Sequence, residues 1–565
     1  MREIARSSFW QLLVVYAALV VLISLNLFWK YTLHFEIFAV VIAVIGAYAL
    51  RELDDNGKKD KVKAARWHYL LLVIGIVLII GLRVVPYLDN SIPLGYDAGI
   101  YKYGIESFAE KGFNVDSWVK GAFTPGFLYL MFVLCKVFGS GAILTWLFIG
   151  FNLLLGVSVY LVGKEYFNKR VGVIAFLLYA VSVIQFKVFT YMYYKNIIAL
   201  SFMLFALYFL KRGNKGARPT RDHARNDIGN YSRVVRSPTH NRVQDNIRKS
   251  RVEQGLLGLG YNRFWFIFFG ILTGIMHRPT FFLFGLAFVC FTVQDYKRLG
   301  RNLVSGVVIL GLTLLIYAGS WRESIAPLFF PLVESFVDPG TAPGTFVSFF
   351  TYQFSTLAYL PFAILGFFYL IWKRKFDMIF FITSIAAIIV YFQFFFFNRF
   401  IIHLDIMLIL LAGSGFSLLI DNKKKLGLLV LVLMLFSAGF VTMHESVNAK
   451  SLISEEGLDL IKKIDTKVER DAFVMVLSSE YSPWVLAYSN RKTIAPGLFE
   501  ENKWFQEEWE RFWRSDSEIE IQEMMSVYDR PIYLFAGNKN FNGPCFSVFM
   551  ELGENKLYQY GCENG

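Results

Sequence analysis

The chain contains 565 residues, of which 55% are hydrophobic, 18% are aromatic and only 18% are charged. About a quarter of the residues of a soluble protein are charged, so this composition excludes an ordinary soluble globular protein and indicates that lipid solvates part of the surface. The net charge of +13 does not indicate nucleic-acid binding, because the basic residues lie between apolar runs, where they orient a membrane protein.

Apolar runs long enough to cross a bilayer recur along the chain from Phe9 onward. No small-residue cleavage site follows the first run, so we interpret it as a retained span and not as a signal peptide. The sequence predicts an α-helical polytopic membrane protein of about 13 spans. These spans are expected near 9–29, 34–50, 68–86, 141–163, 171–189, 193–210, 264–276, 280–296, 302–320, 352–372, 378–397, 400–420 and 426–443.

Lysine and arginine are concentrated in alternate connections between these spans. The basic connections are 51–66, 164–170, 211–263, 297–301, 373–375 and 423–425. The positive-inside rule places them and the N-terminus in the cytoplasm, and everything after 444 outside the plasma membrane. The apolar stretch 123–138 could be a further span, but the thirteen basic residues of 211–263 would then lie outside. We therefore expect 123–138 to be an amphipathic or re-entrant segment on the outer face.

Two segments are too polar for the membrane. Residues 211–263 are rich in Arg and Asn and lack apolar periodicity, which predicts a disordered cytoplasmic loop, with binding of lipid headgroups as the alternative. Residues 445–565 carry 21 acidic and 13 basic residues, a net charge of −8, and alternate helical and strand patterns. They predict a small extracytoplasmic α/β domain, which follows an N-terminal helical hairpin with its cytoplasmic loop (1–67) and a membrane core (68–444).

Charged and tyrosine residues converge on one level of this topology, the outer mouth of the helix bundle. A charge at membrane depth costs about 2.5–3.5 kcal/mol, so such residues usually face a cavity or a partner. The candidate site residues are Asp97, Tyr101, Lys102, Lys195, His277, Arg278 and Arg399. Cations beside a carboxylate and tyrosines suit an anionic, phosphate-bearing substrate with a hydroxyl-rich group. The alternative for each charged residue is a simple interfacial anchor.

Several motifs occur in a characteristic order. They are Asp97 in the first large outer loop, TPGFLYL (124–130), YFNKRVGVIAFLLYAVS (166–182), GILTGIMHRPTFF (270–282), and Arg399 at the start of a late span that ends in LLAGSGF. This order, over about 68–420, resembles the GT-C superfamily of polyprenyl-phosphate-sugar-dependent glycosyltransferases. Protein O-mannosyltransferases and lipid A aminoarabinose transferases are members of that superfamily.

The resemblance implies a GT-C-like fold and the transfer of a hexose or pentose from a polyprenyl-phosphate donor to an acceptor hydroxyl on the extracytoplasmic face, with inversion. In such a reaction Asp97 would remove the acceptor proton. Arg399, with Lys195 and Arg278 behind it, would stabilise the leaving lipid phosphate. His277 could be a base or a structural hydrogen-bonding residue. No second carboxylate follows Asp97, so we expect no metal and no cofactor besides the lipid-linked donor.

The expected partners are the polyprenyl-phosphate sugar, a glycan, lipid or protein acceptor, and membrane lipids. Other functions stay open. A transporter or flippase of lipid-linked sugars would also explain the bundle and its charges, although the hydropathy pattern shows no internal repeat. Residues 478–496 resemble the stretch around the Trp-Trp-Asp-Tyr-Gly motif of oligosaccharyltransferases, but Ser478–Ser482 occupy the place of the motif. A non-catalytic scaffold is the third alternative.

The four cysteines include no CxxC pair, which argues against a thiolate zinc site. Cys135 and Cys290 lie in apolar runs and are expected to be inert packing residues. Cys545 and Cys562 flank FSVFMEL, GEN and KLYQYG, a pattern that predicts a β-hairpin. Because a hairpin brings its two ends together, these two cysteines are expected to form a disulfide on the oxidising side of the membrane.

Overall fold

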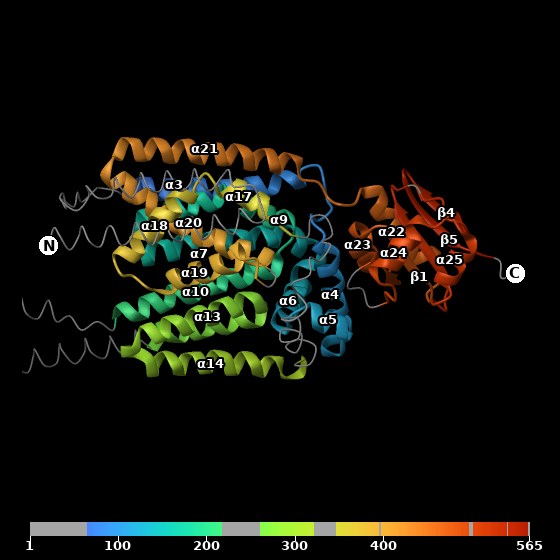
Figure 1. Ribbon diagram of the computed structural model, residues 1–565, viewed down its shortest axis with the longest axis horizontal. Helices are drawn as coiled ribbons and strands as arrows, with labels where there is room; N and C mark the ends of the chain where they lie inside the picture. Colours follow the sequence, from blue (N-terminus) through green and yellow to red (C-terminus); the bar gives the residue numbers. More distant parts are fainter. Residues whose placement is uncertain are drawn as a thin grey trace, which may run out of the picture.

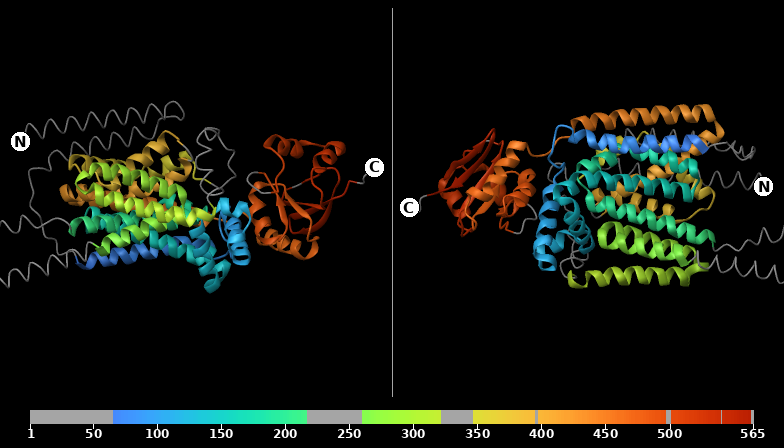
Figure 2. Two further views of the ribbon diagram at one scale, coloured as in Figure 1. Left: turned by 90° about the horizontal axis from the view of Figure 1, so that it is seen from below. Right: turned by 180° about the vertical axis from the view of Figure 1, so that it is seen from behind.

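The computed structural model describes residues 65–216, 260–320, 346–394, 397–496, 501–539 and 541–562, which form a helical bundle and a smaller C-terminal α/β unit (Figure 1). The two units lie end to end, with α4 (Asp97–Lys111), α5 (Ser117–Ala122) and α6 (Pro125–Ala142) between them (Figure 1 and Figure 2). The expected spans 9–29 and 34–50, and most of the predicted loop 211–263, lie outside the described residues.

The helices of the bundle run roughly along its long axis (Figure 1). They are α3 (Ala65–Val84), α7 (Phe148–Tyr166), α8 (Lys169–Ala180), α9 (Val183–Thr190), α10 (Tyr194–Gly216), the helical residues 260–276, α13 (Arg278–Gln294), α14 (Leu299–Tyr317), α17 (Phe349–Thr356), α18 (Leu360–Trp372), α19 (Met378–Tyr391), α20 (Phe397–Asn422) and α21 (Lys424–Asn448).

Among the described residues, six helices are long and apolar enough to cross a membrane, or eight spans result if each of two bent helix pairs counts as one. The helices α13 and α19 are apolar but shorter. The chain is therefore a mostly helical membrane protein, as predicted. The expected count of about 13 spans is not confirmed.

Two predicted spans, 171–189 and 352–372, were expected to be continuous and are each broken into two helices. The axes of α8 and α9 differ by 50°, and those of α17 and α18 by 80°. The second break has a direct chemical cause, because Pro361 in the first turn of α18 lacks an N–H group and its ring excludes a preceding helical turn. At the first break Ser182 caps α9 by accepting a hydrogen bond from the amide of Gln185 at 3.2 Å.

The stretch 123–138, expected not to span, corresponds to α6, which runs across the end of the bundle (Figure 1). Residues 125–166 form an apolar helical stretch of 42 residues, about twice the length of one crossing. Gly139 interrupts this stretch with a φ of 77°, a conformation that favours glycine. A single π-helical turn over 143–147 then leads into α7.

The C-terminal unit contains one five-stranded mixed sheet in the order β2-β1-β3-β5-β4. Its strands are β1 (Phe473–Val476), β2 (Lys492–Ile494), β3 (Ile532–Gly537), β4 (Phe546–Leu552) and β5 (Asn555–Tyr560). Strand β1 pairs in parallel with β2 and β3, whereas β5 pairs antiparallel with β3 and β4. The predicted α/β character and the closing hairpin are thus both observed.

Helices cover both faces of this sheet. They are α22 (Glu455–Lys467) and α23 (Ser482–Tyr488) on one face, and α24 (Gln506–Arg514) and α25 (Glu518–Met525) on the other. Successive residues of β1 alternate between the two cores, since Val474 packs in one core with Trp484 and Met475 packs in the other with Trp509. The core that contains Trp484 is continuous with that of the bundle, so α22 and α23 are the elements that join the two units.

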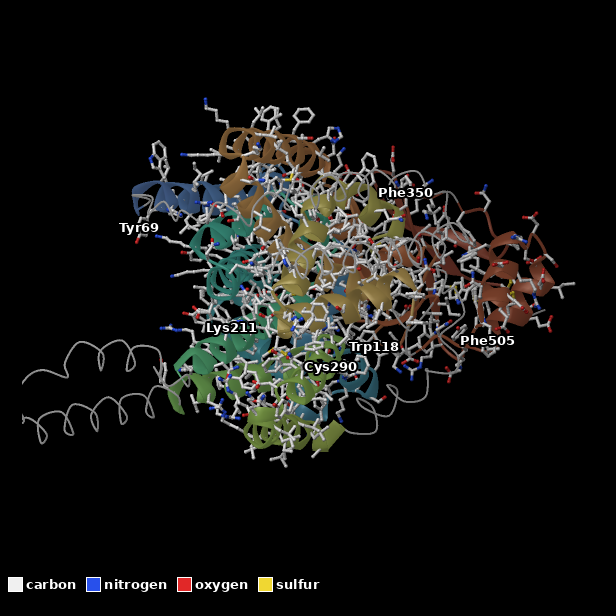
Figure 3. All side chains as sticks on the ribbon, turned by 60° about the vertical axis from the view of Figure 1, so that its left-hand side comes forward. Tyr69, Trp118, Lys211, Cys290, Phe350 and Phe505 are labelled. Carbon is white, nitrogen blue, oxygen red and sulfur yellow. A yellow bond between two sulfur atoms is a disulfide. The ribbon has the colours of Figure 1, made fainter. Side chains whose placement is uncertain are left out.

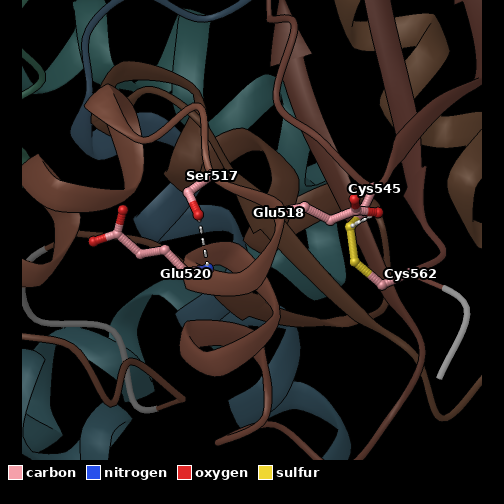
Figure 4. Close-up of a disulfide and its surroundings, with 5 residues drawn as sticks. All are labelled: Ser517, Glu518, Glu520, Cys545 and Cys562. Atoms are coloured by element: carbon pink, nitrogen blue, oxygen red, sulfur yellow. Dashed lines mark hydrogen bonds between the residues drawn. A yellow bond between two sulfur atoms is a disulfide. The ribbon is translucent and has the colours of Figure 1, made fainter. Parts of the chain in front are cut away.

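Cys545 and Cys562 form a disulfide at the two ends of the β4–β5 hairpin, with Cα atoms 4.7 Å apart (Figure 4). The backbone amide of Gly561 also donates to the carbonyl of Cys545 at 2.8 Å. A carboxylate oxygen of Glu518 on α25 lies 3.6 Å from the sulfur of Cys545. The bridge joins the two open ends of this hairpin, whose strand β4 lies at the edge of the sheet.

Replacing both Cys545 and Cys562 by serine should lower the free energy of unfolding of the C-terminal unit by about 3 kcal/mol, the loop-entropy value for a closed loop of this size. The reason is that the unfolded chain regains the freedom of the closed loop. Thermal unfolding of the purified chain measures the change, and Cys135→Ser, which removes a free thiol, is the control. Equal unfolding temperatures for the double variant and the control would contradict the expected stabilisation.

Candidate functional site

Asp97 lies in the first turn of α4, at the end of the bundle that faces the C-terminal unit, and its side chain is partly exposed. The preceding loop packs tightly on the end of α9. A Cβ atom on Gly95 would lie 2.6 Å from the carbonyl oxygen of Thr190, and Gly95 has a φ of 77°. Only glycine satisfies both conditions. Gly95 thus brings Asp97 beside the segment that connects α9 to α10.

Two cations from distant regions of the sequence act on the Asp97 carboxyl. They are Lys195, in the first turn of α10, and Arg399, in the first turn of α20. Burial raises the pKa of the Asp97 carboxyl above its ordinary value, and the positive charges of Arg399 and Lys195 act in the opposite direction. The structure therefore brings one carboxyl group, one ammonium group and one guanidinium group within electrostatic reach of one another.

Aromatic side chains pack around Tyr101 and Lys195 on the side of the charged group that faces α5 and α6. Tyr101 is buried and packs at a tilted angle against the rings of Phe123, Phe127 and Tyr194, with ring centroids 5.4–5.9 Å apart. The Lys195 ammonium lies 5.9 Å from the centroid of the Tyr101 ring and 5.0 Å from that of Phe123. The Lys195 ammonium is therefore flanked by aromatic rings.

Lys195 and Arg278 both bind the C-terminal end of the short helix α5. The Lys195 ammonium donates to the carbonyl of Ala122 at 2.7 Å. The Arg278 guanidinium donates to the carbonyls of Gly121 at 3.2 Å and Lys120 at 3.4 Å. The last carbonyls of a helix have no partner within it and attract cations. The structure thus assigns Arg278 mainly to α5, whereas Lys195 contacts α5 and also acts on Asp97.

His277 lies behind the charged group and is buried. Its Nδ1 is 2.8 Å from the hydroxyl of Thr280 and also accepts from the Thr280 amide, so His277 caps α13. The same hydroxyl lies 2.7 Å from Nε2 of His403 on α20. Of the two roles left open by the sequence, this geometry favours the structural one. His403 was not among the predicted site residues, because a histidine within a long apolar run carries no distinguishing spacing.

Lys102 points away from Asp97 and toward the C-terminal unit. Its ammonium forms a salt bridge with Glu106 and lies 4.5 Å from the centroid of the Tyr488 ring on α23. Asp97 and Lys102 are five residues apart on one helix, about 140° around the axis, so they cannot share a face. Of the seven predicted site residues, the structure gathers Asp97, Tyr101, Lys195 and Arg399, with Arg278 and His277 adjacent.

A cavity of about 340 Å³ opens between the loop 91–93, the end of α6 with the π-helical turn 143–147, and the helices α22 and α23. Trp146, Lys462 and Tyr488 are among its lining residues, whereas Asp97 and Arg399 are not. In the regions of the chain that the structure describes, the one set of side chains close enough to hold a metal ion is Glu518 with Cys545 and Cys562. Both cysteines are in the disulfide, so these atoms are not thiolate ligands.

The C-terminal unit rests directly on α4. A Cβ atom on Gly99 would lie 2.3 Å from the carbonyl oxygen of Pro483 in α23, so the two helices meet where Gly99 has no side chain. The hydroxyl of Ser451 donates to the carbonyl of Pro93 at 3.3 Å. The contact at Gly99 is only two residues from Asp97, and it places the stretch 478–496 next to the candidate site.

Comparison with known proteins shows which proteins this chain resembles in sequence and in fold. A family model described as dolichyl-phosphate-mannose-protein mannosyltransferase matches residues 123–222. No curated protein matches the amino-acid sequence significantly. The oligosaccharyltransferase AglB from Archaeoglobus fulgidus, in complex with an inhibitory peptide and a dolichol-phosphate, has a TM-score of 0.59 at 14% identity, over 84% of this chain and 69% of AglB.

ArnT from Cupriavidus metallidurans is also similar. Its apo structure has a TM-score of 0.54 at 12% identity and covers 88% of this chain and 98% of ArnT. Its structure bound to undecaprenyl phosphate has a TM-score of 0.52 at 12% identity, over 88% and 99% of the two chains. AglB and ArnT are both GT-C glycosyltransferases, so the resemblance to this superfamily is confirmed, and the identities show a shared fold.

The contact at Gly99 predicts the effect of a side chain there. Gly99→Val should destabilise the docking of the C-terminal unit by about 1–3 kcal/mol, because backbone must move to admit the new atoms. Limited proteolysis near residue 450 and thermal unfolding measure the effect. Gly150→Val on α7 is the matched control, since a Cβ atom there meets no atom within 4 Å. Equal protease resistance of both variants would contradict the tight contact.

Proposed function

We propose that this chain, which has the GT-C fold, is a membrane glycosyltransferase that moves a sugar from a polyprenyl-phosphate donor to an acceptor hydroxyl. The single observation that carries the proposal is the meeting of Asp97, Lys195 and Arg399 at the end of the bundle beneath the C-terminal unit. A carboxylate beside two cations matches the two charges of the reaction, a proton to be removed and a phosphate to be stabilised. In support, the similar AglB structure is a complex with a dolichol-phosphate, and one of the ArnT structures is bound to undecaprenyl phosphate.

In the proposed step the acceptor oxygen attacks the anomeric carbon of the sugar. The acceptor proton passes to the Asp97 carboxylate, the new carbon–oxygen bond forms, and the bond from the anomeric carbon to the phosphate oxygen breaks. Burial keeps the Asp97 carboxyl more basic than an ordinary one, which favours proton removal. Arg399 and Lys195 stabilise the negative charge left on the lipid phosphate. One direct displacement inverts the anomeric centre and requires no metal.

The proposed site faces the extracytoplasmic side of the plasma membrane. In support, the basic residues Lys211 and Lys373–Lys375 belong to the end of the bundle away from the C-terminal unit, where Figure 3 labels Lys211. The positive-inside rule assigns that end to the cytoplasm. The proposed division of the chain is then residues 1–67, of which 1–64 lie outside the described residues, the membrane core (68–444) and the outer domain (445–565).

A protein acceptor, as in oligosaccharyltransferases, is the second candidate within this function. The observation that favours it is the position of α23, which belongs to the stretch 478–496 and lies against α4 two residues from Asp97. A transporter or flippase of lipid-linked sugars is the competing function. A transporter or flippase needs the cations but no general base. A variant that lacks the Asp97 carboxylate therefore distinguishes this function from glycosyl transfer.

Asp97→Asn should lower the turnover number by about 10²–10⁴-fold, the usual contribution of a general base, and leave binding of the polyprenyl-phosphate donor nearly unchanged. Transfer from a panel of radiolabelled polyprenyl-phosphate hexoses and pentoses measures turnover in proteoliposomes. Asp89→Asn, an exposed carboxylate in the preceding loop, is the matched control. Full transfer by Asp97→Asn would contradict the assignment of the base. Sugar translocation without transfer in the parent chain would favour the flippase.

The pH dependence tests the same residue independently. Asp97 can accept a proton only when it is ionised, so kcat/KM should fall as the pH drops through a pKa above the ordinary carboxyl value of about 4. Arg399→Gln removes the positive charge that most strongly lowers the pKa of Asp97. This substitution should therefore move the acidic limb of the kcat/KM profile to higher pH. The pH profiles of kcat/KM of the two proteins provide the measurement. An acidic limb that stays in place would exclude Asp97 as the titrating group.

A further inference from the structure

Asp405 is a fully buried carboxylate that the proposed reaction does not use. It lies on α20, in which 94% of an apolar stretch of 18 residues is buried inside the protein, and the Asp405 side chain is inaccessible to solvent. Three side chains donate to it, namely the Gln185 amide at 2.7 Å, the Ser182 hydroxyl at 3.2 Å and the Tyr359 hydroxyl. A carboxylate inside a membrane bundle is retained only where such partners satisfy it.

The first two partners belong to the break between α8 and α9. Ser182 occupies the break itself, and Gln185 lies in the first turn of α9. The carbonyl freed at the break, that of Val181, accepts from the Thr442 hydroxyl of α21 at 2.7 Å. An interrupted helix is stable at membrane depth only when neighbouring groups satisfy its free polar atoms. Thr442 provides such a partner for the backbone, and Asp405 accepts from the Ser182 and Gln185 side chains at the break.

The third partner belongs to the break between α17 and α18. Tyr359 is the residue that precedes the first turn of α18, at the corner where the two helix axes differ by 80°. Its hydroxyl reaches the other oxygen of the Asp405 carboxylate, since Gln185 and Ser182 occupy the first one. One carboxylate therefore joins both bent helix pairs to α20.

Both bent pairs lead directly into the candidate site. Helix α9 ends at Thr190 and is followed by a short connection that carries Tyr193, after which Lys195 lies in the first turn of α10. Helix α17 is preceded by Phe346, whose ring centroid lies 5.0 Å from the Arg399 guanidinium. The hydroxyl of Tyr193 is hydrogen-bonded to the backbone of Val347. The two segments thus contact each other and Arg399 at the level of Asp97.

We propose that Asp405 is a positioning residue, which clamps the two helix breaks to α20 and thereby holds the segments around Tyr193–Lys195 and Phe346–Val347 against Arg399. This inference rests on the proposed glycosyl transfer for its link to a reaction, and on the hydrogen bonds alone for the placement of the segments. Replacing the Asp405 carboxylate by an amide would place an N–H donor opposite the donor groups of Ser182 and Gln185 or of Tyr359. The two helix breaks would then lose their common hydrogen-bond acceptor.

Distances between spin labels test the placement without any turnover. The full chain carries Cys135→Ala and Cys290→Ala, which remove the free thiols, and is placed in lipid nanodiscs. A reference label at Phe436→Cys on α21 is paired in turn with Thr190→Cys on α9, Phe350→Cys on α17 and Val293→Cys on α13. Phe350, Val293 and Phe436 are 62%, 68% and 74% exposed, and Figure 3 labels Phe350.

Asp405→Asn should broaden the distance distributions of the α9 and α17 pairs and leave the α13 pair unchanged. Asp377→Asn is the matched control, because Asp377 is also buried and paired, with Lys211 at 3.0 Å, at the other end of the bundle. Unchanged distributions in Asp405→Asn would overturn the proposal, and so would equal broadening of all three pairs. If Asp405→Asn does not accumulate, Tyr359→Phe should broaden the α17 pair alone, and an unchanged pair would overturn the clamp.

The same variants then test the link to the reaction. Asp405→Asn should lower kcat by about tenfold or more with a smaller change in the KM for the lipid donor, because misplaced reacting groups slow chemistry more than binding. Asp377→Asn should retain both constants. A kcat that is unchanged in spite of broadened distances would overturn the role in the reaction. Absence of transfer in the parent chain would refute the proposed function, while the label distances still decide the clamp.

Discussion

The close packing of α20 against its neighbours is the constraint on which the rest of the bundle depends. A Cβ atom on Gly366 would lie 2.0 Å from the carbonyl oxygen of Leu411, and one on Gly415 would lie 2.1 Å from that of Phe362. Helices in lipid gain little from hydrophobic association, so their packing relies on such close backbone approach. This packing makes α20 the buried centre of the bundle. Its buried polar side chains therefore use partners on neighbouring helices, as His403 does with Thr280 and Asp405 does with Gln185.

This requirement connects the interior of the bundle to its end. Arg399, His403 and Asp405 occupy successive levels of α20, and each meets a different set of neighbours. Arg399 acts on the Asp97 group, His403 contacts Thr280 beside the cap of α13, and Asp405 holds the two helix breaks. A polar group that satisfies a broken helix at membrane depth also fixes the direction of the segment that follows. The charged group at the end of the bundle is thus positioned from within the membrane.

The amino-acid sequence predicted the features of this arrangement that depend on local signals. Hydropathy located the helices, and charge at their ends pointed to Asp97, Lys195 and Arg399. The sequence could not locate the break at Ser182, because the apolar run continues through this position and the residues that stabilise the break are distant in sequence. Lys102 was grouped with Asp97 because the helical conformation of 97–111, which separates them, was not predicted. The role of Arg278 depends on α5, a helix of 6 residues without an apolar pattern of its own.

The turn at Gly139 has a consequence for how the chain enters the membrane. During synthesis, residues 125–166 present an apolar stretch that could be threaded across the bilayer in either of two halves. The turn between the two halves lies at one position, Gly139, whose backbone conformation favours glycine although the space around it is open. If the first half were threaded as well, every later connection would emerge on the opposite side. The backbone conformation of one glycine therefore separates the two halves of this stretch, the first of which runs across the end of the bundle.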